Sequence, residues 1–159
     1  MDIIIKITQE NIDQLDLSPV TSVINKLQAE NGVMGAEQKI KFNIDYPRQE
    51  TDPREWSEMP EIRLWFIAVD VRYGYLPLLL NWREGELARY VAMLVPHQFN
   101  RSEGIQYNSE ALDIFIMTKM FFLHQWLKTQ GITGNARLRA LAQIFGYDLD
   151  DSFFALLQQ

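Results

Sequence analysis

Apolar and polar residues alternate in two stretches near the start of the chain. In residues 3–8 the isoleucines Ile3, Ile5 and Ile7 fall on one side, and residues 40–46 carry an apolar or aromatic side chain at every second position. Successive side chains of a strand point to opposite faces. Both stretches therefore predict strands with one buried face.

A helix is predicted between these two strands. Ser18 suits the N-cap and Pro19 suits the first helical position, and apolar residues follow at helical spacing through residues 20–27. Asn31-Gly32 ends this helix, because both residues tolerate the left-handed conformation that closes many helices.

Residues 62–69 are apolar on both faces apart from Arg63. A fully buried central strand has this pattern, and a buried helix has it as well, since periodicity alone does not separate the two in short apolar runs. We predict a strand here, with a buried helix as the alternative.

Helical patterns dominate the rest of the chain. The longest runs from Asn108 or Ser109 to about Lys128 and is apolar almost all round, which predicts burial at the centre of the domain. Shorter helices are expected near residues 75–80, 87–94, 136–145 and 150–157.

Strands that come first and helices that follow favour an α+β fold. We expect a single domain over residues 1–159, with a small, mainly antiparallel sheet of about three to four strands packed against about five helices. The long helix near residues 108–129 would be its central element.

Composition limits the functions open to this chain. It has no cysteine, so it offers no disulfide framework, no thiolate zinc or iron–sulphur ligands and no thiol nucleophile. The net charge of -6 disfavours nucleic acid as a partner and favours a protein. Its start shows no signal-peptide pattern, and no apolar run reaches the ~20 residues of a membrane span. We therefore expect a cytoplasmic protein that does not insert into membranes.

The segment from Asp45 to Arg63 is the strongest candidate for a binding site. It combines arginines, carboxylates and tryptophan, the composition of interaction hot spots. The predicted partner-binding residues are Arg48, Asp52, Arg54, Glu55, Trp56, Glu58, Glu61 and Arg63. The alternative interpretation is an internal ion-pair network that holds a proline-containing loop against the sheet. A metal or catalytic site is the third interpretation, and the interleaved arginines weaken it because they neutralise the same carboxylates.

Two histidines offer little catalytic chemistry. His97 follows Pro96 at a helix end, where a bond to a helix carbonyl is its simplest role, and His124 lies in the long apolar helix. A small metal-assisted hydrolase or isomerase would need His97 together with Asp45, Asp52, Glu55 or Glu58. No recognised catalytic, cofactor or metal motif occurs, so we predict no catalytic, cofactor-binding or metal residues.

The last two predicted helices have the rhythm of a helix–turn–helix. Arg137 and Arg139 lie on the first, but Asp148, Asp150 and Asp151 crowd the turn and the second. A recognition helix presents cations to phosphate, so this pattern argues against DNA binding.

Several longer motifs resemble the chlororespiratory reduction 6 family. They are NIDQLDLSPV, IDYPR, DPRE, SEMPEIRLWF, WREGELARY, MLVPHQF, GIQYNSEALDIF and FGYDLDDSFF, spread from about Asn11 to Leu157. The stretch Tyr73-Gly74-Tyr75 departs from the proline-containing version of the family.

This resemblance implies a non-catalytic, chaperone-like assembly factor. Its target would be the photosynthetic NAD(P)H dehydrogenase-like complex of cyclic electron flow, and its partner the ferredoxin-like iron–sulphur subunit of the peripheral arm. The factor would work near the thylakoid membrane without inserting into it. Plant members of the family carry a transit peptide, so the resemblance implies a cyanobacterial, cytoplasmic form for this chain. The family has no established active-site residues to carry over.

Overall fold

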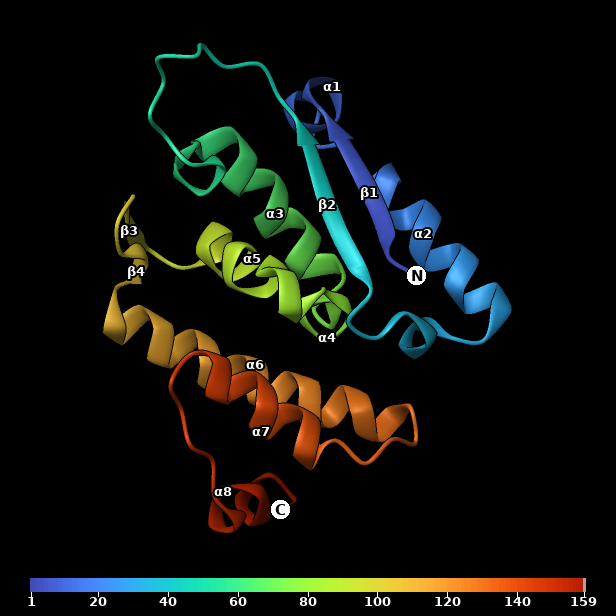
Figure 1. Ribbon diagram of the computed structural model, residues 1–159. Coiled ribbons are helices and arrows are strands. Elements are labelled where there is room, and N and C mark those ends of the chain that lie inside the picture. The colour runs from blue at the N-terminus through green and yellow to red at the C-terminus, as the bar shows by residue number, and fades with distance from the viewer. Residues whose placement is uncertain (159) are drawn as a thin grey trace. The chain divides into compact units, whose positions relative to one another are not determined.

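The computed structural model describes residues 1–158, which form two compact units, Met1–Tyr107 and the described part of Asn108–Gln159. Four strands and eight α-helices occur among the described residues, which confirms the α+β class (Figure 1). The strands form two separate two-stranded sheets rather than one sheet, and the helices exceed the five expected. The single domain predicted over residues 1–159 stays a prediction.

The first unit carries all of the strands. Its elements are, in order, β1 (Ile3–Thr8), α1 (Gln9–Asp13), α2 (Ser18–Glu30), η1 (Val33–Ala36), β2 (Ile40–Asp45), η2 (Trp56–Glu58), α3 (Pro60–Arg72), α4 (Leu76–Leu79), η3 (Trp82–Glu84), α5 (Glu86–Leu94), β3 (His97–Asn100) and β4 (Gly104–Tyr107).

β1 and β2 lie side by side and run parallel, with Ile3 opposite Ile40 and Thr8 opposite Asp45 (Figure 1). Parallel neighbours need a crossover connection, and α2 supplies it. Both strands were predicted and are confirmed. The prediction of a mainly antiparallel sheet was wrong for this pair, because the helix between the strands returns the chain to the same end of the sheet before β2 begins.

A second strand pair, β3 and β4, forms an antiparallel hairpin in which His97 lies opposite Tyr107. The side chain of Asn100 organises its turn by accepting the amide N–H groups of Ser102 and Glu103, at 2.8 and 3.3 Å. The Tyr107 hydroxyl donates to the carbonyl of Ala88 at 2.6 Å and so fastens the hairpin to α5. Sequence periodicity did not predict these short strands.

The central strand predicted for residues 62–69 is wrong, since these residues belong to helix α3. Pro60 in the first turn has the backbone angle of a helix start and lacks an N–H that would go unbonded there. Ile62 and Trp65 are completely buried, whereas Leu64, Ile67 and Val71 are exposed. The helix has no polar face, which is why its pattern resembled a buried strand.

Aromatic rings make the centre of the first unit. Phe42 of β2 lies edge-on to Phe66 of α3 at a centroid distance of 5.1 Å, and Phe66 lies edge-on to Tyr90 of α5 at 5.9 Å. Polar atoms of this core find partners: the Trp65 indole donates to the carbonyl of Asp16 at 2.9 Å, and the buried Tyr90 hydroxyl donates to Asp70 at 2.9 Å. The cluster fixes β2, α3 and α5 against one another.

The second unit consists of α6 (Ser109–Thr129), α7 (Asn135–Ile144) and α8 (Asp151–Leu157). The long helix is confirmed, and the Asn108 side chain caps it by accepting the Ala111 amide at 2.9 Å. Its predicted burial on all sides is wrong, because Ile114 and Phe121 are 63% and 57% exposed. Phe121 instead meets Phe153 of α8, with ring centroids 6.4 Å apart.

Gly134 shows how tightly α7 begins against α6. A Cβ at this position would lie 2.4 Å from Cδ1 of Leu127, closer than side chains approach one another. A side chain at this position would force Leu127 to shift where the chain turns from α6 into α7. Within residues 1–158, none of the helices combines the length and the apolar character needed to cross a bilayer.

Candidate functional site

The segment from Asp45 to Arg63 joins the end of β2 to the first turns of α3. Residues 46–55 form neither helix nor strand, and the single 3-10 turn η2 follows them. Pro47 and Pro53 limit the backbone in this stretch, and Pro60 opens α3. The segment is thus a loop with a single short helical turn, which agrees with its three prolines.

Arg54 and Asp52 form a bidentate pair. Arg54 Nε lies 3.1 Å from Asp52 Oδ1, and Arg54 Nη2 lies 2.8 Å from Asp52 Oδ2. The backbone N–H of Arg54 also donates to Asp52 Oδ1 at 3.0 Å. These hydrogen bonds, with Arg54 as the main cause, lower the pKa of Asp52 to about 2. Asp52 is therefore a charged carboxylate whose hydrogen-bond donors already come from Arg54 of the same loop.

Arg48 crosses the loop and joins its two ends. Its guanidinium lies 4.3 Å from the ring centroid of Trp56 and donates to the carbonyl of Arg54. Tyr46 meets the same indole edge-on at 6.4 Å. A guanidinium over an indole face is a favourable cation–π arrangement. Trp56, at the end of the loop, therefore contacts Tyr46 and Arg48 at its beginning.

Glu55 and Glu58 hold η2 in place. The Glu58 carboxylate accepts the backbone N–H of Glu55, which closes a capping interaction around the turn. Glu55 Oε1 lies 2.9 Å from Nε of Arg89 on α5. Packing of α3 against α5 brings η2 to Arg89.

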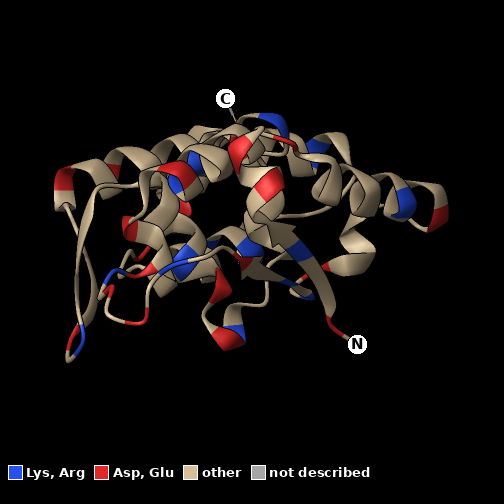
Figure 2. Cartoon of the chain, turned by 90° about the horizontal axis from the view of Figure 1, so that it is seen from above, with Lys and Arg blue, Asp and Glu red and all other residues tan. Residues whose placement is uncertain are grey.

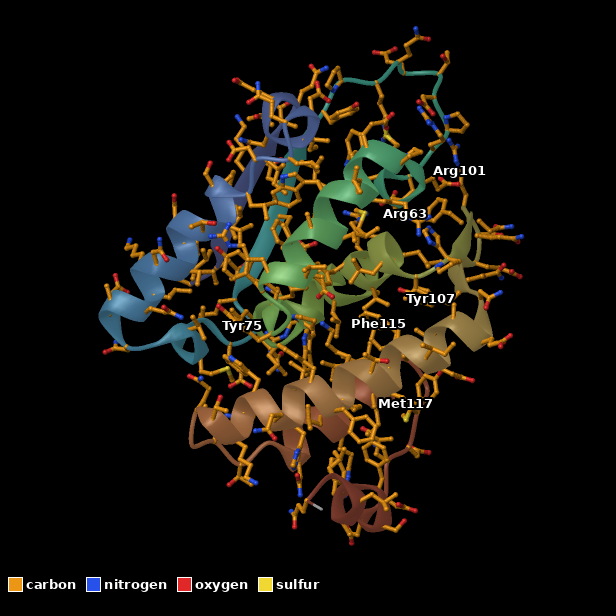
Figure 3. All side chains as sticks on the ribbon, turned by 180° about the vertical axis from the view of Figure 1, so that it is seen from behind. Arg63, Tyr75, Arg101, Tyr107, Phe115 and Met117 are labelled. Atoms are coloured by element: carbon orange, nitrogen blue, oxygen red, sulfur yellow. The ribbon has the colours of Figure 1, made fainter. Side chains whose placement is uncertain are left out.

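Arg63 and Glu61, both in the first turn of α3, differ in burial. Arg63 is half-buried, and its Nε donates to the carbonyl of Met93 in α5 at 3.2 Å (Figure 3). Glu61 is exposed. Arg63 thus links two helices, whereas Glu61 remains on the surface.

The eight predicted residues accordingly fall into three groups. Arg63 and Glu55 reach α5, whereas Asp52, Trp56 and Glu58 have their partners within the segment. Arg48, Arg54 and Glu61 are exposed around them. The segment is therefore a braced loop that carries charges of both signs on its outer side.

The enzyme alternative required His97 to meet the carboxylates of this segment. Instead, one ring nitrogen of His97 lies 3.0 Å from Ser57 Oγ and the other lies 3.0 Å from the carbonyl of Val95. A carbonyl only accepts, so Nδ1 carries a hydrogen and donates it to Val95, while Nε2 lies within hydrogen-bond distance of the Ser57 hydroxyl. Val95 follows α5 directly, which confirms the predicted bond to a helix-end carbonyl. Ser57 is completely buried and is out of reach as a nucleophile.

Metal-binding chemistry finds little support in the same region. Across residues 1–158, no three histidine or carboxylate side chains gather in a way that could hold a metal ion. Asp45 is turned away from the loop toward Lys6 of β1, whose Nζ lies 3.8 Å from its carboxylate. The carboxylates at positions 45, 52, 55 and 58 thus have four different neighbours.

A cavity of about 240 Å³ lies beside the segment. Its walls come from β2, η2, α3 and α5, and its lining residues are Phe42, Asn43, Ile44, Trp56, Phe66, Glu86, Arg89, Tyr90 and Met93. Glu86 Oε1 accepts the backbone N–H of Phe42 at 2.8 Å, and burial raises the pKa of Glu86. Sequence reasoning missed this cavity, because its walls come together only in the folded unit.

Charges elsewhere are interspersed rather than gathered by sign (Figure 2). On α7, Arg139 lies 3.0 Å from Asp151 of α8, and its guanidinium lies 5.1 Å from the ring centroid of Phe154. Arg137 donates to the carbonyl of Thr133 at 3.1 Å. Both cations of the helix–turn–helix-like segment are thus engaged by their own unit.

Comparison of the sequence with known families identifies a family for this chain. The sequence model of the chlororespiratory reduction 6 family matches residues 7–156 of the 159 residues. No solved structure matches the chain. The matched range extends over most of both units and includes the whole segment from Asp45 to Arg63. This chain therefore belongs to the chlororespiratory reduction 6 family.

Proposed function

We propose that this protein is a non-catalytic, chaperone-like assembly factor that binds the ferredoxin-like iron–sulphur subunit of the photosynthetic NAD(P)H dehydrogenase-like complex. Family membership supports a role in the assembly of that complex. We further propose that the protein works in the cytoplasm of a cyanobacterial-type cell, near the thylakoid membrane.

The braced loop is the observation that carries the proposal. Trp56 stacks with Arg48, and α5 holds Glu55 through Arg89, so the backbone of the loop is fixed before any partner arrives. A pre-organised surface loses less conformational entropy on binding than a flexible one. Its exposed charges, on Arg48, Arg54 and Glu61, are of both signs and suit a partner with complementary charges.

The absence of cysteine from the sequence suits the proposed client. A nascent iron–sulphur cluster is held by cysteine thiolates. A chain without cysteine can contact the protein around such a cluster site without competing for iron as a thiolate donor.

The proposal is tested by binding of the purified iron–sulphur subunit to wild type and to a charge-reversed variant, Arg54→Glu with Glu61→Arg. Both side chains are exposed, so the fold should persist. We expect at least about a tenfold rise in Kd, equivalent to about 1.4 kcal/mol, in isothermal titration calorimetry.

The matched control is Lys26→Glu with Glu30→Arg, two exposed positions on α2 that receive the same kinds of charge reversal. It should bind like wild type. If wild type fails to bind the subunit, the proposed client is wrong. If the Arg54/Glu61 variant is folded and binds as wild type does, the client stands and the segment is not its binding site.

A further inference from the structure

The outer edge of β2 is open at one end. β1 occupies the other edge, where the Ile3 N–H donates to the carbonyl of Lys39 at 2.7 Å. Backbone groups of a strand point alternately to its two sides. With Lys39 directed at β1, the register directs Lys41 and Asn43 to β1 as well, and it directs the backbone groups of Phe42 and Ile44 outward.

The first part of this outer edge is filled from within the unit. The carbonyl of Ile40 accepts the N–H of Asn81 at 2.9 Å, and the N–H of Phe42 donates to Glu86. Beyond them the pairing stops. Among residues 1–158, no hydrogen bond joins the outward carbonyl of Phe42 or the outward N–H and carbonyl of Ile44 to another group. An unpaired strand edge of this kind is a template for another strand.

The cavity of about 240 Å³ opens beside this same stretch, since Phe42 and Ile44 form part of its wall. Rings of Trp56, Phe66 and Tyr90 line it as well. Aromatic faces attract cations and also contact the aliphatic stem of a long side chain. A side chain of a strand added at Ile44 would therefore meet aromatic walls.

Glu86 gives the cavity a negative end. One of its oxygens is bonded to the Phe42 amide, and the side chain is half-buried. The nearby cations are directed elsewhere, Arg89 to Glu55 and Lys41 to Glu84. Within the described residues Glu86 therefore has no ion pair of its own. Burial raises its pKa, and the charges of Arg89 and Lys41 oppose that rise only in part.

Charge around the cavity points to the same kind of ligand. The segment Asp45–Arg63 contains six carboxylates and three arginines, a formal net charge of -3, and the whole chain carries -6. A cationic segment is attracted to such a surface, and an acidic one is repelled.

We propose that the outer edge of β2 at Phe42 and Ile44, together with the adjoining cavity, binds an extended segment of a partner protein that carries a lysine or arginine. The segment pairs with Ile44 as an added strand. Its cationic side chain enters the cavity between the aromatic rings and approaches Glu86. This inference rests on the proposed function only in that the partner is a protein.

The probe is a capped peptide with the sequence Thr-Val-Lys-Val-Thr, added to isotope-labelled protein and followed by amide chemical shifts. We expect a saturable shift of the Ile44 amide. A peptide with glutamate in place of the lysine, and a lysine peptide with N-methylated backbone amides, separate the charge contribution from strand pairing. Each should bind at least fivefold more weakly.

Glu86→Gln removes the charge and keeps an acceptor for the Phe42 N–H. We expect it to weaken the lysine peptide by about tenfold, a loss typical of one charged contact. Glu84→Gln is the matched control, because Glu84 is an exposed carboxylate of the same region that pairs with Lys41 outside the cavity. It should change the affinity less than twofold.

The inference is overturned if the peptide does not bind, if the lysine and glutamate peptides bind equally, or if the shifts spare Ile44. Binding of the iron–sulphur subunit is measured separately. A subunit that binds wild type and Glu86→Gln equally overturns the inference and leaves the proposed function intact. A lysine peptide that binds as expected, with a subunit that does not bind at all, supports the strand-addition site and overturns the proposed client.

Discussion

Replacing Ile62 by alanine should destabilise the protein far more than the same truncation at Leu64, two residues further along α3. Ile62 is 0% exposed and Leu64 is 53% exposed. Truncating a fully buried isoleucine to alanine costs about 2–5 kcal/mol, which includes the cavity left behind. Complete burial of a leucine side chain is worth about 1.5–3 kcal/mol, so a side chain that keeps half of its surface in water should lose about 1 kcal/mol. Alanine's higher helix propensity offsets a few tenths of that loss.

Urea unfolding followed by circular dichroism measures both changes, provided that the slope of the free energy of unfolding against urea is the same in all variants. The comparison tests the helix itself. Positions two apart share a face in a strand, but they lie on different sides of a helix. Equal losses for Ile62→Ala and Leu64→Ala would therefore refute helix α3 and favour the buried strand that the sequence suggested.

Two further predictions concern a charge pair and a helix cap. The pKa of Asp52 is lowered to about 2 by Arg54, so the stabilisation from this pair is present above the usual carboxyl value of 3.8 and is lost as the pH falls toward 2. In an NMR titration, Arg54→Ala should raise the Asp52 midpoint toward 3.8, and an unchanged midpoint would contradict the assigned cause. Asn108→Ala should lower the free energy of unfolding by about 1 kcal/mol in urea, because the Ala111 amide loses its acceptor. Asn108→Asp keeps the acceptor and should retain most of this stability, so equal losses in the two variants would argue against capping.

The two strands of the first sheet were predictable because each is half-buried and its side chains alternate. Their parallel pairing was not predicted, although the sequence held a clue. A helix predicted between two strands is the pattern of a βαβ unit, in which the strands run parallel. An antiparallel sheet was expected instead, because the rest of the chain does not continue the alternation of strands and helices.

Helix α3 shows where periodicity fails. Leu64, Ile67 and Val71 are exposed on the side away from the buried Ile62 and Trp65, so no polar stripe marks the outer face. The better signal was Pro60 at its start, because proline is common in the first turn of a helix.

The candidate site was predictable only in its local contacts. Arg54 and Asp52 are two residues apart, so their pairing follows from sequence proximity. The ion pair of Arg89 with Glu55 and the hydrogen bond from the Phe42 amide to Glu86 join distant parts of the chain, and they form only once α5 packs beside α3 and β2. A sequence alone names the charged residues but does not say which tertiary partner each one meets.

The parallel pairing of β1 with β2 also constrains the order in which the protein can fold during synthesis. Ile3 pairs with Ile40, so every contact in this sheet spans 40 − 3 = 37 positions. Until β2 has left the ribosome, β1 has no partner, and its isoleucines and both of its edges are open to other chains. Unpaired edges of this kind promote aggregation. β1 therefore stays unpaired until a large part of the first unit has been synthesised.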